Sequence, residues 1–147
     1  MAPSGVSAAR RMRAFNRFYT ELIGALDDRH EGLGVTLAES RCLFTIDRLK
    51  SPDVGLIAKE LGLDLGYVSR LVSRLERAGQ VSRSRVNGDH RRKAVRLTDD
   101  GAALLDELAQ RSDARMRAIA SHLSERDVSR LLAAMDTIHG LIGPKDS

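Results

Sequence analysis

The sequence has few aromatic residues and a single cysteine. Aromatic residues make up 3% of its 147 residues and Trp is absent, so binding of nucleic acid by stacking bases on rings is not expected. The one cysteine, Cys42, excludes an intramolecular disulfide framework and favours a cytoplasmic location. Because it stands in an apolar stretch with Leu43 and Phe44, we expect a buried structural thiol. Whether it senses redox conditions stays open.

Long apolar runs and catalytic motifs are also missing. The longest apolar run is residues 131–135, whereas a membrane-spanning helix needs about 20 apolar residues and a signal peptide about seven. No P-loop, dinucleotide-binding glycine motif, nucleophile elbow or zinc-protease motif occurs, so neither an enzyme nor a cofactor is expected. Cys42 and the four His residues show no metal-ligand spacing, so no metal site is predicted, although a zinc sensor built from distant residues stays open.

Helical periodicity is the main feature that is present. Hydrophobic residues are 42% and charged residues 30%, which is typical of a folded globular protein. Apolar residues recur at steps of three and four through most of the chain. The predicted fold is mainly α with a small β-hairpin. We expect helices over about 9–29, 37–49, 54–61 and 65–78, strands over 81–86 and 94–97, a long helix opening at 98–100 with an apolar stripe to Leu123, and a last helix after Ser124.

Short-range signals mark the ends of these elements. Thr36 and Glu39 have the spacing of a capping box, and Asp53 and Asp64 are expected N-caps of the next two helices. The Asn-Gly pair at 87–88 predicts a hairpin turn, and the charged residues 89–93 are expected to form a long tip of that hairpin.

Residues 56–71 have the pattern of a helix-turn-helix. Ala58 is small enough for two helices to cross closely, and Gly62 suits the positive φ that a tight turn needs. Ile57, Val68 and Leu71 supply apolar contacts for the crossing. The same pattern also occurs in helical bundles that bind nothing. The exposed residues therefore have to distinguish a DNA-binding motif from such a bundle.

Positive charge is concentrated just after this pattern. Between Gly66 and Thr98, nine Lys and Arg residues stand against two acidic ones, a net charge of +7 in a chain whose total is +4. Phosphate neutralisation requires such a concentration. Gly66 would let the helix N-terminus approach a phosphate, and Arg70 suits guanine. The candidate DNA-contacting residues here are Gly66, Tyr67, Ser69, Arg70, Ser73, Arg74, Arg83, Arg85, Arg91, Arg92 and Lys93.

Two segments resemble a known family. Residues 68–76, Val-Ser-Arg-Leu-Val-Ser-Arg-Leu-Glu, with Gly79, and residues 89–101, Asp-His-Arg-Arg-Lys-Ala-Val-Arg-Leu-Thr-Asp-Asp-Gly, resemble MarR-type winged helix-turn-helix transcription factors. The resemblance covers about residues 10–142. It implies that the first segment is a recognition helix and the second a wing followed by a long helix. It also implies that Asp89 holds Arg91, which enters a minor groove. His90 would meet the sugar-phosphate backbone.

The resemblance further implies a domain organisation and a function. A winged helix-turn-helix DNA-binding domain is expected over residues 36–103, and a helical dimerisation domain over residues 8–35 and 104–147. The apolar faces left over on the first and last helices agree with a homodimer. We expect a sequence-specific, double-stranded DNA-binding regulator, usually a repressor, on a pseudo-palindromic operator. The alternative is a winged-helix protein-interaction module without specific DNA binding.

A small-molecule effector is a further expectation from the resemblance. MarR-type proteins often respond to phenolic or other small anions held between the dimerisation helices and the winged domain. The candidate residues for such a ligand are Arg13, Asn16, Tyr19 and Arg41. The alternative is that these are ordinary polar residues of the surface or core.

Overall fold

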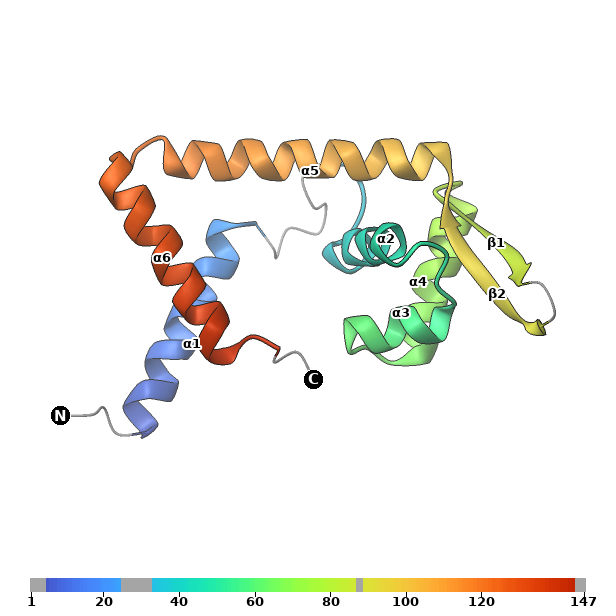
Figure 1. Ribbon diagram of the computed structural model, residues 1–147, viewed down its shortest axis with the longest axis horizontal. Helices are drawn as coiled ribbons and strands as arrows, with labels where there is room; N and C mark the ends of the chain where they lie inside the picture. The colour runs from blue at the N-terminus through green and yellow to red at the C-terminus, as the bar shows by residue number, and fades with distance from the viewer. Residues whose placement is uncertain (1–4, 25–32, 87–88, 145–147) are drawn as a thin grey trace. The chain divides into compact units, whose positions relative to one another are not determined.

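The structure, a computed structural model, describes residues 5–24, 33–86 and 89–144 (Figure 1). These residues form six helices and one antiparallel two-stranded sheet, so the predicted fold class is confirmed. In chain order the elements are α1 (Gly5–Leu22), α2 (Leu37–Leu49), α3 (Val54–Leu61), α4 (Leu65–Arg77), β1 (Val81–Val86), β2 (Asp89–Leu97), α5 (Asp99–Ala120) and α6 (Glu125–Ile142). Two compact units are present, divided between Arg111 and Ser112 within α5. The predicted domain limits stay a prediction.

The predicted helix caps form as expected. Thr36 Oγ1 accepts a hydrogen bond from the Glu39 amide at 3.2 Å, and Glu39 Oε2 accepts one from the Thr36 amide at 3.1 Å, which completes the capping box of α2. The Asp53 carboxylate accepts from the Leu56 amide at 2.8 Å at the start of α3. Each such cap stabilises its helix by about 1 kcal/mol. The helix starts were therefore predictable from local chemistry.

The core lies among α2, α3, α4 and the hairpin. Leu43 of α2, Ile57 of α3, Leu71 of α4 and Val95 of β2 are each 0% exposed, and Leu108 of α5 is 5% exposed. Burial of each of these side chains contributes about 1.5–3 kcal/mol. The tight turn between α3 and α4 is the predicted one, since Gly62 has φ 63°. This packing fixes α4, whose opposite face is left in solvent.

The hairpin, called the wing below, is attached to the turn between α2 and α3. The Val95 amide donates to the Pro52 carbonyl oxygen at 2.8 Å, and Arg96 Nε donates to Ser51 Oγ at 2.7 Å. Lys50 and Ser51 have φ of 52° and 67°, a left-handed conformation that side chains with Cβ rarely adopt. These contacts with β2 hold the turn in that conformation.

The second strand of the wing is longer than predicted. The sequence predicts a charged tip at 89–93, but β2 begins at Asp89, so the expected tip is wrong. The pairing runs from Val81 opposite Leu97 to Arg85 opposite Lys93, and the register shifts between Arg85 and Val86. Both faces of a two-stranded ribbon can meet water, so charged side chains do not prevent the strand from continuing. The predicted turn at 87–88 lies outside the described residues.

A short network connects the wing to α5. Thr98 Oγ1 donates to the Gly79 carbonyl oxygen at 2.6 Å and accepts from the Gly101 amide at 3.1 Å. The Thr98 amide donates to the Gln80 carbonyl oxygen at 3.1 Å. A Cβ at Gly101 would overlap that same carbonyl oxygen, so only glycine fits there. Thr98 in the Leu-Thr-Asp-Asp-Gly sequence thus caps the start of α5 and is hydrogen-bonded to Gly79 and Gln80, which follow α4.

The helix α1 differs from its predicted bounds. It begins earlier than residue 9 and ends at Leu22, where Gly24, with φ 69°, follows in a turn. The predicted end at residue 29 is therefore wrong, and residues 25–32 lie outside the described part. Gly24 can take the left-handed conformation that ends a helix, whereas the apolar spacing alone suggested continuation. No residue of α1 is buried, and its exposed apolar residues include Phe15, Phe18 and Leu22.

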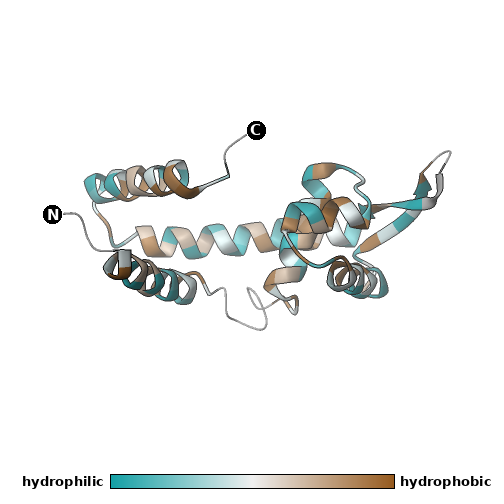
Figure 2. Cartoon of the chain, turned by 90° about the horizontal axis from the view of Figure 1, so that it is seen from below, coloured by the Kyte–Doolittle hydropathy of each residue, from teal (hydrophilic) through white to brown (hydrophobic). Residues whose placement is uncertain are grey.

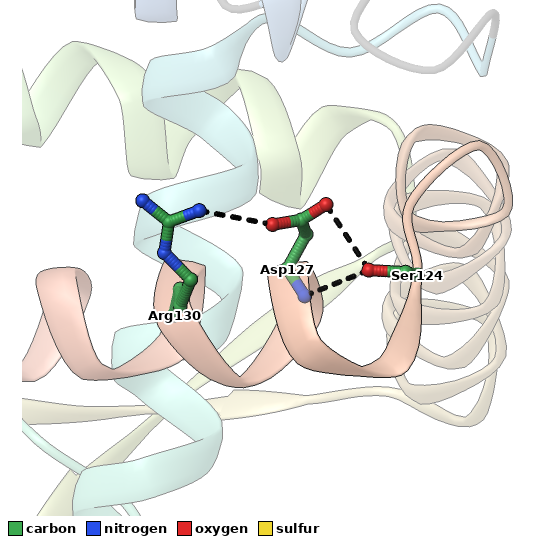
Figure 3. A network of polar contacts seen from close by, with 3 residues as sticks. All are labelled: Ser124, Asp127 and Arg130. Atoms are coloured by element: carbon green, nitrogen blue, oxygen red, sulfur yellow. Dashed lines mark hydrogen bonds and ion pairs between the residues drawn. The ribbon is translucent and has the colours of Figure 1, made fainter.

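The helix α6 begins at the predicted cap. The Ser124 hydroxyl oxygen accepts from the Asp127 amide at 3.1 Å, and Asp127 accepts from Arg130 at 3.1 Å (Figure 3). No residue of α6 is buried. Hydrophobic residues recur along α1 and α6, the helices nearest the labelled chain ends in Figure 2. Among the described residues, no helix is long and apolar enough to span a bilayer.

Candidate nucleic-acid interface

The two faces of α4 differ sharply in character. Val68, Leu71, Val72 and Leu75 are buried in the core. The remaining positions face outward or lie at the edges of the buried stripe, since a helix of 3.6 residues per turn separates the two sets. The predicted contact residues on this second face are Gly66, Tyr67, Ser69, Arg70, Ser73 and Arg74. The structure therefore gathers six predicted residues on one helix surface.

The first turn of α4 is shaped by Asp64 and Gly66. Asp64 Oδ2 accepts from the Tyr67 amide at 3.0 Å, so this carboxylate already occupies one of the free amides at the helix N-terminus. A Cβ at Gly66 would lie 3.2 Å from Asp64 Oδ2 and 3.5 Å from Arg70 Nη1. A side chain at Gly66 would therefore be close to the capping carboxylate of Asp64, whereas its distance from Arg70 is an ordinary contact. The predicted approach of a phosphate to Gly66 stays a prediction.

Several cations near α4 are held by other side chains. Arg74 Nε lies 3.4 Å from Glu39 Oε1, and the Glu39 side chain is only 13% exposed. Arg92 Nε lies 3.5 Å from Asp53 Oδ2. Both carboxylates also cap helices, so Glu39 connects α2 to α4 and Asp53 connects α3 to the wing. Local spacing revealed the capping roles of these acids but not their second partners.

Arg83 is the third cation that is held within the protein. Its Nη2 donates to Ser73 Oγ at 2.9 Å, and its Nε lies 3.7 Å from Glu76 Oε2. This contact joins two residues that the sequence predicts as separate DNA contacts. Because Ser73 is on α4 and Arg83 is on β1, the hydrogen bond connects the helix to the wing.

Other cations have no partner within the described part of the chain. No hydrogen bond or ion pair is found there for Arg70 and Arg77 of α4, Arg85 of β1 or Lys93 of β2. All four are exposed, and Arg85 and Lys93 are directly opposite each other in the sheet. The sequence already indicates that Arg77 is on the exposed face of this helix, seven residues or about two helical turns after Arg70, although it is not among the predicted contacts.

The remaining predicted wing residues are Asp89, His90 and Arg91. All three belong to β2. Their side chains lie outside the described part of the structure, so the expected contact of Asp89 with Arg91 stays a prediction.

The predicted effector residues lie on two helices. Arg13, Asn16 and Tyr19 belong to α1, and Arg41 belongs to α2. Tyr19 stacks on Phe15 with ring centroids 5.8 Å apart, whereas Arg13, Asn16 and Arg41 are exposed. No hydrogen bond or ion pair joins the four within the described residues. Their role in binding an effector stays a prediction.

The cysteine is buried, as predicted. Cys42 is 0% exposed, and burial, followed by the nearby Glu39 carboxylate, raises the pKa of its thiol to about 11. Such a thiol is a weak nucleophile near neutral pH. Among residues 5–24, 33–86 and 89–144, no three His, Cys, Asp or Glu side chains gather into a metal site.

Comparison with known proteins identifies similar sequences and a similar fold. Residues 35–93 match the model of the MarR family. The transcriptional regulator MgrA of Staphylococcus aureus is 37% identical over 79 residues, which cover 54% of this chain and 52% of that protein. The chain thus aligns with about half the length of MgrA. The regulator PecS of Dickeya dadantii is 27% identical over 117 residues, which cover 78% of this chain and 70% of PecS.

A solved structure shows that the fold is shared. A variant of MarR from E. coli, crystallised with operator DNA, has a TM-score of 0.70 and 22% sequence identity. The comparison covers 93% of this chain and 99% of that one.

Proposed function

The chain belongs to the MarR family, and from this premise we propose that it binds a pseudo-palindromic site in double-stranded DNA as a homodimer and regulates transcription there, most simply as a repressor. A cytoplasmic location accompanies this function. MarR-family transcription regulators are not enzymes, in agreement with the missing catalytic motifs.

The observation that carries the proposal is the set of exposed cations on α4 and the wing that have no partner among the described residues. Arg70 and Arg77 project from one helix face, and Arg85 and Lys93 stand together on the wing. Cationic side chains without an internal partner are available to phosphates. When such side chains neutralise phosphates, the counterions bound to the DNA are released. The helix α4 has 13 residues, about 20 Å in length, which suits insertion into a major groove. The related MarR structure with operator DNA supports the same use of the fold.

Selection of duplexes from a random pool, followed by titration at two salt concentrations, tests this proposal. We expect a two-fold symmetric site with half-sites about one helical turn apart, and affinity that falls steeply with salt. Failure to retard any duplex at low salt would reject DNA binding and favour the protein-interaction alternative.

Arg70→Ala tests the role of the recognition helix. The guanidinium, which has no partner in the described part of the chain, is expected to contact base edges. Its loss should therefore weaken operator binding by about 1–3 kcal/mol and relax base preference at one position of each half-site. Arg130→Ala is the charge-matched control, since Arg130 is exposed on α6 and pairs with Asp127. Equal losses in the two variants would show that only total charge matters.

Release by an effector is the remaining part of the proposal. A small anionic or phenolic ligand held by Arg13, Asn16, Tyr19 and Arg41 should dissociate the DNA complex. Titration of salicylate into the complex, with Arg41→Ala as the comparison, tests this part. Dissociation that is unchanged in Arg41→Ala would contradict the assignment of that residue.

A further inference from the structure

The contact between Arg83 and α4 differs from the other charged contacts of the wing. The Arg83 side chain is only 22% exposed, although it belongs to a six-residue strand of a solvent-facing hairpin. Its Nη2 donates to Ser73 Oγ at 2.9 Å, and its Nε lies 3.7 Å from Glu76 Oε2. Ser73 and Glu76 are one helical turn apart on α4. A single guanidinium therefore connects β1 to two positions of the helix.

The strand pattern explains why Arg83 faces α4. Successive side chains of a strand point to opposite faces, so Val81, Arg83 and Arg85 share one face. Val81 is 2% exposed and belongs to the core, which fixes that face as the inner one. Arg83 is opposite Val95, which is fully buried. Arg83 thus follows the last core residue of β1 along the face that packs on the helix.

Arg83 is also the outermost anchor of β1 to α4. Two residues farther along the same face, Arg85 has no hydrogen bond or ion pair with any described residue. Immediately after Arg85 the register of the sheet shifts. Within the described residues of β1, side-chain hydrogen bonds and ion pairs with α4 therefore end at Arg83. Arg83 is therefore the last described residue of β1 at which a side-chain contact can fix the position of the wing relative to α4.

Resting on the proposed function, we propose that Arg83 is a positioning residue and that it does not contact DNA. With Ser73 and Glu76 it forms a clamp that sets the direction of the wing relative to α4. Arg70 and the pair Arg85 and Lys93 can then reach two grooves of one duplex together. Ser73 is occupied by the clamp and does not read bases.

The clamp affects DNA binding by pre-organisation. If the wing moves freely on α4, binding has to order it, and this entropy cost lowers the affinity. Removing a clamp changes no phosphate contact, so the number of released counterions stays constant. Removing a phosphate contact instead reduces the slope of log K against log salt by about 0.9. The salt slope therefore separates a positioning residue from a contact residue.

Arg83→Ala and Arg85→Ala form a matched pair, because both remove an arginine from the same face of one strand. In DNA-free protein, we expect the amides of β1 to exchange about tenfold faster in Arg83→Ala and at unchanged rates in Arg85→Ala. In DNA titrations, both variants should bind more weakly. The salt slope should stay constant for Arg83→Ala and fall by about 0.9 for Arg85→Ala.

Two further variants keep the test decisive if Arg83→Ala folds poorly. Ser73→Ala removes only the acceptor oxygen, and it should lower affinity without changing the salt slope. When it is combined with Arg83→Ala, the double variant should bind no more weakly than Arg83→Ala alone, because both changes break one contact. Arg83→Lys retains the charge but loses the two-pronged guanidinium, so it should not restore affinity.

Different outcomes overturn different claims. A reduced salt slope in Arg83→Ala, additive losses with Ser73→Ala, or unchanged amide exchange in β1 would each overturn the clamp. If the unmodified protein retards no duplex, the proposed function fails, but exchange measured without DNA still decides whether Arg83 positions the wing. The two failures are therefore distinguishable.

Discussion

At the scale of single residues, Cys42 shows how burial controls reactivity. Burial first, and the Glu39 carboxylate second, raise the pKa of its thiol from 9.0 to about 11. Near neutral pH this lowers the thiolate fraction by about 100-fold relative to an unfolded chain. Alkylation by iodoacetamide at about pH 8 should therefore be at least about 100-fold slower in folded protein than in urea. Mass spectrometry of timed samples measures this ratio, and rapid labelling of folded protein would contradict it.

The same shift in pKa predicts a change in stability at high pH. Above pH 9 the unfolded chain releases the thiol proton while the folded protein retains it, so the folded state loses stability as the pH rises toward 11. The full effect is about 2–3 kcal/mol. Urea unfolding measures the free energies of unfolding of the unmodified protein and of Cys42→Ala. As the pH rises from 9 to 11, the unmodified protein should lose stability relative to the variant. A pH-independent difference would contradict the shift.

Gly66 is a second residue at which stability and binding should separate. Alanine favours a helix over glycine by up to about 1 kcal/mol, so Gly66→Ala should not lower the melting temperature if Asp64 shifts slightly. The added Cβ would lie at an ordinary contact distance, 3.5 Å, from Arg70 Nη1, but it would cover the first turn of α4, where a phosphate is expected to approach. We expect unchanged or higher stability together with weaker operator binding. Thermal unfolding and DNA titration measure the two, and retained affinity would contradict the approach of a phosphate to Gly66.

At the scale of elements, the junction of α4 and α5 depends on a glycine without space for a side chain. A Cβ at Gly101 would overlap the Gln80 carbonyl oxygen, which also accepts from the Thr98 amide. Gly101→Ala should therefore destabilise the protein by about 1–3 kcal/mol in urea unfolding. Gly55→Ala is the control in the first turn of α3, where a Cβ would have only one contact, with Asp53 Oδ1 at 3.4 Å. Similar losses in both variants would contradict the close approach.

Elements with local signals were predictable from the sequence, and those that depend on tertiary contacts were not. The start of α3 at Asp53 and the start of α4 at Asp64 follow from cap chemistry within three residues. The extension of β2 through residues 89–93 depends instead on backbone pairing with β1, which local charge does not reveal. Likewise, the sequence identified Arg83 and Ser73 as candidates but could not show that they contact each other.

At the scale of the whole molecule, charge and apolar surface are separated along the chain. The stretch from Gly66 to Thr98 has a net charge of +7, and the chain as a whole only +4, so the remainder is acidic overall. The exposed apolar residues of α6, in contrast, are on a helix with no buried residue at all. Apolar surface of this kind is typical of a face covered by a second chain. The proposed dimer thus uses helices other than α4 and the wing, which are proposed to contact DNA.

Met135→Glu tests this use of α6. Met135 is 36% exposed and stands among Leu131, Leu132 and Ile138 on one face of the helix. A charge there cannot be buried against a partner at low cost, so we expect the mass measured by light scattering to fall from dimer to monomer. Operator affinity should drop by about 100-fold or more, because a monomer engages one half-site. Ala133→Glu adds the same charge on the opposite side of the helix and should leave both values unchanged. A monomeric mass for the unmodified protein, or equal effects of the two variants, would place the dimer contact elsewhere.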